Sequence, residues 1–482
     1  MKKKNILFIL PDQLRWDYLG CYGAEFAKTP AIDCLAAEGV CYTNAISPSP
    51  LCVPARAAVL TGRNAIENGV LGNDTWLRPD HEACGVYTWP KILAKNGYET
   101  VAIGKMHFYP WDADEGFETR IISEDKRHVD VKDDYADALA NRGLKKFRAS
   151  DYPEYHAKKG AMKNPLPREC QADIWIAEQA CSYLENRNDS RPFAMMVGFL
   201  SPHCPYDPDE SLLDDFPIKK MPAPIPPTEE SMQFHDRFLQ DYRAEWAQLD
   251  YSEFTDEQKL TVKAYYSACI KDIDLAVKKL VDTLKRTNLY DDTVIIFSSD
   301  HGDLVGDFGM VAKHYFYEPS IHVPLIIRDP SFKVSGKKYT ENVSLTDIRA
   351  TILHIAGVKN PETSESRILS CYNQVNDDRT IFGCIDFGWM IRKGTWKYTC
   401  YNNGLEELHN MEKDPYEQRN LCKEPSYANL VKALRMELNA WVMQSILNAN
   451  EEKTAGPAAA SSMEDYSKRN WNRPYPYRAK KV

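Results

Sequence analysis

The sequence predicts an α/β fold, in which helices cover both faces of a doubly wound, mostly parallel central sheet and a smaller carboxy-terminal α+β subdomain follows. Three observations predict it. Continuous apolar runs recur along the first part of the chain, segments with apolar residues at helical spacing lie between them, and the pattern changes after residue 358. Runs that are apolar at every position are typical of strands buried on both faces. Their alternation with helices indicates a parallel sheet.

The strands of the central sheet are predicted where short apolar runs stand between polar residues. The clearest helices are predicted over 171–187 and 265–286, because apolar residues recur there every three or four positions and charged residues occupy the positions between them. The predicted strands are NILFIL (5–10), FAMMVGFL (193–200), TVIIFSS (293–299) and VPLIIR (323–328).

Residues 110–170 differ from their surroundings, because they are rich in charged and aromatic residues and show no clear periodicity. We expect a solvated insertion here. Since residues 142–170 carry many lysines and arginines, the alternative is a lid that meets an anionic ligand. A proline-rich stretch at 216–230 predicts a loop that crosses the surface.

The carboxy-terminal part has a different pattern. Residues 379–401 alternate short apolar stretches with turn residues, which predicts a small antiparallel sheet. Residues 426–450 then show the spacing of a helix. The change of pattern places a boundary near 360–375.

The predicted domains follow from this boundary. We expect a large domain over 1–370, which includes the insertion at 110–170, and a subdomain over 371–482 that holds the antiparallel sheet, the helix and a tail. The tail RNWNRPYPYRAKKV (469–482) is basic and aromatic, and it either packs on the large domain or frays.

The composition limits the classes of function. The 482 residues are 43% hydrophobic and 27% charged, with a net charge of −9, which argues against a general nucleic-acid binder. A local basic pocket for an anionic substrate stays compatible with this charge. No apolar run approaches the roughly 20 residues that cross a bilayer, so we expect no membrane partner.

The amino-terminal stretch MKKKNILFILPDQ (1–13) has a basic start and an apolar run, as a signal peptide does. The run is about six residues long and no small-residue cleavage site follows it, so a buried first strand is predicted instead. We therefore expect a cytoplasmic protein; a periplasmic location stays open if a leader precedes this sequence. Thirteen cysteines without CxxC spacing predict mostly buried thiols.

The stretch SPLCVPARAAVLTGR (49–63) carries the strongest chemical signal. Pro54 suits an early helical position, and Gly62 can end the helix in a left-handed conformation. Cys52 then lies at a helix amino terminus, where free N–H groups favour an anion, and Arg56 projects from the same face. A lone cysteine at such a place is structural more often than catalytic. A thiol phosphatase loop is excluded, because its arginine would follow six residues after the cysteine.

The whole string resembles the signature C-x-P-x-R followed by L-T-G-R of the type I sulfatases of the alkaline phosphatase superfamily. In that family the cysteine is oxidised to formylglycine, which hydrates to a gem-diol that attacks the sulfur of a sulfate ester. The resemblance therefore implies a formylglycine derived from Cys52, a sulfuric ester hydrolase activity, and a formylglycine-generating maturase as a partner. Ala55 stands where the family usually has serine.

Two predicted strands end in polar pairs that are candidate metal ligands. The first strand is followed by Asp12 and Gln13, and the strand at 293–299 is followed by Asp300 and His301. In open α/β sheets, ligands gather at the carboxyl ends of strands, so the pairs can converge on one cation. Taken singly, each acid is better explained as the cap of a turn; with Cys52 between them in the sequence, the metal site is favoured.

The resemblance implies that these pairs and the side chain at 52 hold a divalent metal. Gln13 replaces an aspartate of the family pattern, which removes one negative ligand. Oxygen donors favour Ca²⁺ first and Mg²⁺ second, while His301 leaves room for Mn²⁺ or Zn²⁺.

Three further short matches complete the resemblance, namely GKMHF (104–108), SPHCPY (201–206) and GMVAKHYFYEPSIHVPLI (309–326). It implies that their lysines and histidines steady the sulfate and protonate the leaving oxygen. The predicted catalytic residues are Cys52, Arg56, Lys105, His107, His203 and Lys313; the predicted metal ligands are Asp12, Gln13, Asp300, His301 and Cys52; the predicted substrate contacts are His203, Lys313 and His314.

The substrate is predicted only through the resemblance. An Asp-His second pair also occurs in the iduronate-2-sulfatase branch, and a basic insertion suits an anionic sugar. We therefore expect a sulfated saccharide, such as the uronate 2-O-sulfate of a heparan or chondroitin glycosaminoglycan. Gln13 and His301 also occur in phosphonate monoester and phosphodiester hydrolases of the superfamily, which are the first alternative. An inactive carbohydrate-binding homologue is the second.

Overall fold

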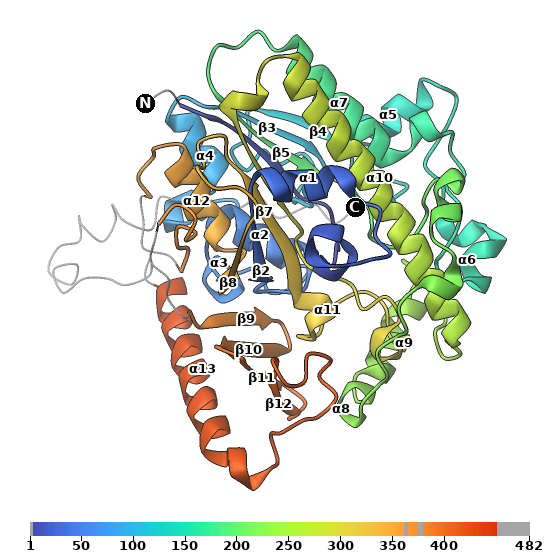
Figure 1. Ribbon diagram of the computed structural model, residues 1–482, viewed down its shortest axis with the longest axis vertical. Coiled ribbons are helices and arrows are strands. Elements are labelled where there is room, and N and C mark those ends of the chain that lie inside the picture. Colours follow the sequence, from blue (N-terminus) through green and yellow to red (C-terminus); the bar gives the residue numbers. More distant parts are fainter. Residues whose placement is uncertain (1–2, 361–364, 374–378, 451–482) are drawn as a thin grey trace, which may run out of the picture.

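The computed structural model describes residues 3–360, 365–373 and 379–450 (Figure 1). The tail at 469–482 lies outside these residues. An eight-stranded sheet in the order β4-β3-β5-β1-β6-β7-β2-β8 forms the centre of the molecule. Its strands are β1 (Asn5–Ile9), β2 (Val40–Ile46), β3 (Glu99–Gly104), β4 (Thr119–Ile122), β5 (Phe193–Gly198), β6 (Thr293–Ser298), β7 (His322–Arg328) and β8 (Lys337–Ser344).

The sheet is mostly parallel, as predicted. Strands β4, β3, β5, β1 and β6 pair in parallel, whereas β7 runs antiparallel to both β6 and β2. The predicted strand at 323–328 is therefore present, but it is the one described strand of this sheet that runs the other way. Because of this reversal, the amino end of β7 lies at the same edge as the carboxyl ends of β1, β6 and β2.

Helices cover both faces of the sheet, which confirms the doubly wound prediction (Figure 1). Along β1, Leu7 and Ile9 enter one apolar core, while Ile6 and Phe8 enter the other. This division follows from the alternation of side chains along a strand. The first core is covered by α1 (Pro30–Glu38), α7 (Ala172–Asn186) and α10 (Asp256–Arg286), and the second by α2 (Cys52–Thr61), α4 (Trp89–Lys95) and α12 (Asp347–Ile355).

The two predicted helices are present, but one starts earlier than predicted. The helix predicted over 171–187 is α7, whereas the helix predicted from 265 is α10 and begins at Asp256. The side chain of Thr255 accepts a hydrogen bond from the backbone of Gln258, whose side chain accepts one in return, and this capping box fixes the start. The first turn is polar and exposed or half-buried, and the buried positions after it include Thr261 and Lys263, so the apolar periodicity is interrupted.

The sequence predicts a solvated insertion over 110–170, but this prediction is wrong for part of the segment. Its residues 119–122 form β4, which pairs with β3 as an edge strand of the central sheet. All four side chains of β4 are half-buried, so the strand carries no fully apolar run. The remaining helices of the large domain are α3 (Ala65–Asn68), α5 (Asp134–Ala140), α6 (Pro153–Ala157), α8 (Glu229–Met232), α9 (His235–Arg243) and α11 (Glu318–Ile321).

A small antiparallel sheet and one helix form the carboxy-terminal part, as predicted (Figure 1). Side chains from three strands of this sheet pack with the buried face of the helix in a separate apolar core. The boundary near residue 370 stays a prediction. The elements are β9 (Ile381–Ile385), β10 (Gly388–Lys393), β11 (Trp396–Tyr401), β12 (Glu406–Asn410) and α13 (Ala428–Ala449).

Buried ion pairs join the two sheets. Glu318 of α11 lies 2.6 Å from Arg392 and 3.0 Å from Lys397, and Lys397 lies 2.5 Å from Glu417. We call these four residues the Glu318 cluster. Burial raises the pKa of Glu318, but Arg392 and Lys397 outweigh burial and hold it well below its ordinary value. The carboxylate is therefore ionised and fixes one sheet against the other.

Across the residues that the structure describes, every helix is too short or too polar to cross a lipid bilayer.

Candidate active site at the carboxyl edge of the sheet

Four potential metal donors meet at the carboxyl edge of the central sheet. Asp12 follows β1, Asp300 and His301 follow β6, and Cys52 is the first residue of α2, which follows β2. One donor atom from each lies within 4.8 Å of the others, and all four side chains are buried. We call these residues the Asp12 cluster. The sequence predicted this convergence from the ends of two apolar strands.

The thiol of Cys52 lies in the middle of this cluster. Its Sγ is 3.2 Å from Nε2 of His301 and 3.7 Å from Oδ1 of Asp12. The Nδ1 atom of His301 lies 2.9 Å from the carbonyl oxygen of Gly302. The ring therefore lies between this carbonyl oxygen and the side chain at position 52. Burial lowers the pKa of His301, but Asp300 and Cys52 outweigh burial and raise it above its ordinary value.

Two buried cations hold the acidic groups in place. Arg56 donates from Nε to Asp300 over 2.9 Å, and its Nη2 lies 3.4 Å from Asp12. Nζ of Lys105 lies 2.7 Å from Asp12. Burial alone would raise the pKa of Asp12, but the neighbouring positive charges, Lys105 foremost, hold it well below its ordinary value. Asp12 is therefore charged at neutral pH.

Gln13 lies next to this cluster in a left-handed conformation, with a φ of 71°. Its backbone N–H donates to Asp300 over 3.0 Å. Its side-chain oxygen accepts a hydrogen bond from Lys313 over 2.6 Å, and its side-chain nitrogen donates to Asp303. The two contacts fix the orientation of the amide, because a carboxylate accepts and an ammonium donates.

Lys313 and His203 form a pair on the open side of the cluster. Nζ of Lys313 lies 2.8 Å from Nε2 of His203, whose Nδ1 lies 2.7 Å from the carbonyl oxygen of Cys204. Burial, followed by the charge of Lys313, holds the pKa of His203 well below its ordinary value. His203 is therefore neutral, and its Nε2 atom accepts a hydrogen bond from Lys313.

His107 lies beside the cluster rather than within it. It has a φ of 59°, and its ring stacks on Trp111 at 5.8 Å between ring centres. Its Nδ1 is buried without a hydrogen-bond partner. Burial, followed by the charge of Lys105, holds the pKa of His107 well below its ordinary value. The predicted catalytic role of His107 stays a prediction.

A cleft of 480 Å³ leads to the pair formed by His203 and Lys313. His314 lies in its wall, where Nδ1 is 3.9 Å from Asp241. Burial, followed by the charge of Lys313, lowers the pKa of His314 to about 3, so this ring is neutral. The volume is within the range of about 300–1,000 Å³ that small-molecule sites occupy.

The sequence analysis missed three residues that support the site. Asp125 lies 3.0 Å from Nζ of Lys105, and Arg127 donates two hydrogen bonds to Asp125. Both belong to the segment 110–170, where no periodicity pointed to them. Asp303 could have been found, because it stands three positions after Asp300 at the same strand end.

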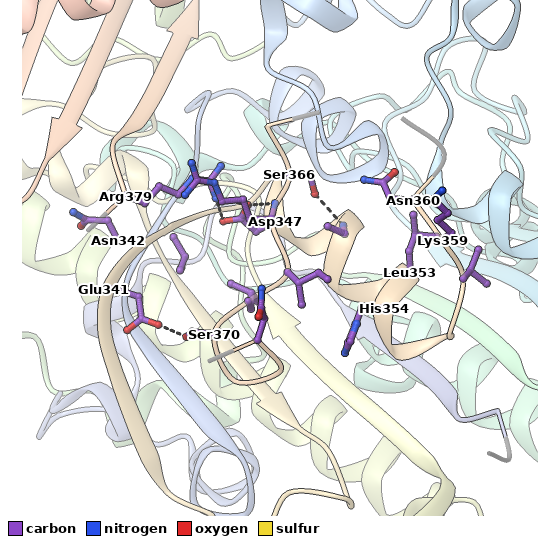
Figure 2. A pocket seen from close by; sticks show the side chains of 17 residues that line it. Glu341, Asn342, Asp347, Leu353, His354, Lys359, Asn360, Ser366, Ser370 and Arg379 are labelled. Atoms are coloured by element: carbon purple, nitrogen blue, oxygen red, sulfur yellow. Dashed lines mark hydrogen bonds and ion pairs between the residues drawn. The ribbon is translucent and has the colours of Figure 1, made fainter. Parts of the chain in front are cut away.

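A second cavity lies elsewhere, between β8, α12 and residues 366–373 (Figure 2). Its volume is 620 Å³. Polar side chains of its wall are tied to one another, since Arg379 pairs with Asp347 and Ser370 donates to Glu341. No residue of the Asp12 cluster lines it.

The Asp12 cluster fits a divalent cation. It offers two carboxylates, one imidazole nitrogen and the side chain at position 52, while the side-chain oxygen of the neighbouring Gln13 accepts a hydrogen bond from Lys313. Carboxylate and amide oxygens are the donors that hard cations prefer, and an imidazole extends the choice to softer ions.

Comparison with known proteins agrees with this fold and cluster. The sulfatase family model matches residues 4–358, and the chain belongs to the sulfatase family. By class it is a sulfuric ester hydrolase, as the sequence predicted. The resemblance to the alkaline phosphatase superfamily is likewise confirmed.

Individual relatives cover nearly the whole chain. An arylsulfatase from Clostridium perfringens is 27% identical over 90% of this chain and 93% of its own. An N-acetylglucosamine-6-O-sulfatase from Bacteroides thetaiotaomicron is 23% identical over 94% of this chain and 88% of its own. The structure of a phosphonate monoester hydrolase of Agrobacterium radiobacter superposes with a TM-score of 0.79 at 23% identity, covering 92% of this chain and 96% of that one.

Proposed function

We propose that this enzyme hydrolyses a sulfate ester with a formylglycine derived from Cys52 as its nucleophile and a divalent metal beside it. One observation carries the proposal. The side chain at position 52 lies at the start of a helix, among two buried carboxylates and the imidazole of His301, and a cleft opens next to it. After conversion by a maturase, the hydrated aldehyde would supply the attacking hydroxyl group.

The metal would be held by Asp12, Gln13, Asp300, His301 and the side chain at 52. Its charge would polarise a sulfate oxygen. Ca²⁺ is the first candidate and Mg²⁺ the second, with Mn²⁺ or Zn²⁺ admitted by His301. Activity should therefore disappear on chelation and return most fully with Ca²⁺.

The residues of this chain would divide the remaining work. Arg56 and Lys105 keep the carboxylates ionised and in position, and Lys105 adds positive charge towards the sulfate oxygens. Lys313 is the proposed donor of a proton to the leaving oxygen, because His203 is neutral and accepts from it.

The proposed substrate is a sulfated saccharide, with the 2-O-sulfate of a glycosaminoglycan uronate as the leading candidate. The guanidinium of Arg237 lines the cleft and suits a carboxylate. The relative from Bacteroides thetaiotaomicron carries a sulfated amino sugar in its name, which supports the broader class. A panel of 2-O-, 6-O- and N-sulfated disaccharides tests the position, and turnover of only the 6-O or N forms would reject the uronate assignment.

Mass spectrometry of the peptide that spans 50–63 tests the nucleophile. Protein made together with a maturase should carry an aldehyde in place of the Cys52 thiol. An unmodified cysteine together with no turnover would instead support the inactive carbohydrate-binding homologue.

A phosphonate or phosphodiester hydrolase is the second candidate function, because Gln13 replaces a carboxylate beside the nucleophile. Turnover of an aryl sulfate and of a phenyl phosphonate should be compared on the same preparation. A higher kcat/KM for the phosphonate would assign the second function.

A further inference from the structure

A second cleft lies next to the cleft of the candidate active site. The first cleft holds His203 and Lys313. The second cleft has a volume of 590 Å³ and is lined by side chains of the 110–170 segment together with residues 244–247. Arg127 and Trp246 line both clefts, so they form the ridge between them.

The ridge is held firmly. Arg127 donates to both oxygens of Asp125 over 2.9 and 2.7 Å, and its guanidinium lies 4.8 Å from the ring centre of Trp246. The ring of Trp246 also packs on Tyr242 at 5.1 Å. Even so, Trp246 is 43% exposed. An indole fixed in this way presents an ordered apolar surface to a ligand at little entropic cost.

The floor of the second cleft joins two parts of the chain. The hydroxyl group of Tyr155, in α6, donates to the carbonyl oxygen of Ala247 over 2.7 Å. Figure 1 shows α6 on the same side of the molecule as α9, which precedes this stretch. The segment 110–170 therefore builds a wall beside the site.

One cation of the second cleft is available to a ligand. Arg148 lines the cleft, and its side chain is 50% exposed. Its carboxylate partner Asp130 is 3.6 Å away and 91% exposed. An exposed pair of this kind contributes little to stability, so an anionic group of a ligand can take the place of Asp130.

We propose that the second cleft binds the sugar ring next to the sulfated one, so that the enzyme acts on sulfated disaccharides or longer chains. The second ring packs on Trp246, and its carboxylate or sulfate group meets Arg148. The inference rests on the proposed function and names its substrate more closely. An aryl or monosaccharide sulfate fills only the first cleft, so only a longer substrate gains from the ridge.

Two variants test the proposal. The quantity measured is kcat/KM for a sulfated disaccharide divided by kcat/KM for a monosaccharide that carries the same sulfated ring. A 2-O-sulfated uronate and a heparin disaccharide that carries it are suitable substrates. We expect Trp246→Ala and Arg148→Gln each to lower the ratio about tenfold, a loss of about 1.4 kcal/mol for the longer substrate. Trp389→Ala and Arg419→Gln, at exposed positions of the carboxy-terminal part, are the matched controls and should leave the ratio unchanged.

Binding separates failure of this inference from failure of the proposed function. In a Cys52→Ala background, calorimetry should show that the sulfated disaccharide binds more tightly than the monosaccharide, and Arg148→Gln should remove the difference. Absence of all sulfate turnover would reject the proposed function alone. Equal binding of both saccharides would overturn the proposal that the second cleft binds a sugar ring. An unchanged kcat/KM ratio in both variants, with melting temperatures equal to that of the native protein, would overturn it as well.

Discussion

The molecule contains two buried clusters of charge that look alike in their contacts and differ in their surroundings. In the Glu318 cluster, each charge meets an opposite charge: Glu318 of α11 pairs with Arg392 and Lys397 of the small sheet, and Lys397 also pairs with Glu417 of the carboxy-terminal part. In the Asp12 cluster, the carboxylates also meet cations, but the Cys52 thiol and the Nε2 atom of His301 face the same space and a cleft opens beside them.

The difference shows what identifies a site. Buried, paired charges alone do not, because the Glu318 cluster has them and serves packing. A cysteine at a helix amino terminus and a place at the carboxyl edge of a mostly parallel sheet distinguish the Asp12 cluster. Changes in the two clusters should therefore have separable effects, one on turnover and the other on folding stability.

Cys52→Ala should have the largest effect. We expect kcat to fall at least about 10⁴-fold, because the nucleophile is lost, with little change in melting temperature. Cys34→Ala, at an exposed cysteine on α1, is the control and should keep full activity. Substantial turnover by Cys52→Ala would contradict the assignment of the nucleophile.

Lys397→Met should show the opposite behaviour. It leaves Glu318 and Glu417 without a shared cation, and breaking a buried pair in this way costs about 3–5 kcal/mol of unfolding free energy. Denaturant unfolding measures the loss, while kcat of the folded fraction should stay near that of the native protein. A loss of kcat without a loss of stability would show that the Glu318 cluster takes part in turnover.

Glu365 differs from the carboxylates of both clusters, because its side chain accepts hydrogen bonds only from neutral donors. It accepts hydrogen bonds from Trp441 and Asn64, and burial raises its pKa to about 7. The folded state therefore binds this proton more tightly than the unfolded state does. Stability should fall by roughly 2–3 kcal/mol as the pH rises from about 4.5 to 7.

The variant Glu365→Gln should remove this part of the pH dependence. Unfolding free energies of both proteins at pH 5 and pH 8 measure it. An unaltered slope in the variant would show that other groups cause the dependence.

Asp303→Asn should have the smallest effect. The new amide can no longer accept from both Gln13 and Tyr206, so the amide of Gln13 loses its fixed orientation towards Lys313. We expect kcat to fall about tenfold. Tyr206→Phe, which removes the other contact of Asp303, is the matched control and should cost less. Equal kcat values for Asp303→Asn and Tyr206→Phe would show that Asp303 does not position the amide of Gln13.

Much of the fold could be predicted, because apolar runs report burial on both faces of a sheet. The same runs located Asp12 and Asp300, since each follows directly on a strand. The edge strand β4 could not be predicted in this way, because half-buried positions give no apolar run. The start of α10 was missed because its first turn is polar and the buried residues that follow include Thr261 and Lys263.

The support for the site was harder to predict than the site itself. Asp125 and Arg127 reach Lys105 only through tertiary contacts, and their stretch of sequence resembles any charged loop. The orientation of Gln13 depends on Asp303 and Lys313, which are distant in sequence. Residue types and spacing cannot report such contacts.

The reversed direction of β7 has a consequence for how the enzyme can vary. The connection from β6 to β7 starts and finishes at one edge of the sheet, with Asp300 at its start and Lys313 in its middle. An acidic group and a cation of the candidate site therefore belong to a single loop that returns to the edge it left. A change in the length of this loop would move Lys313 while Asp300 keeps its place after β6, whereas loops elsewhere can change without altering the spacing of the two groups.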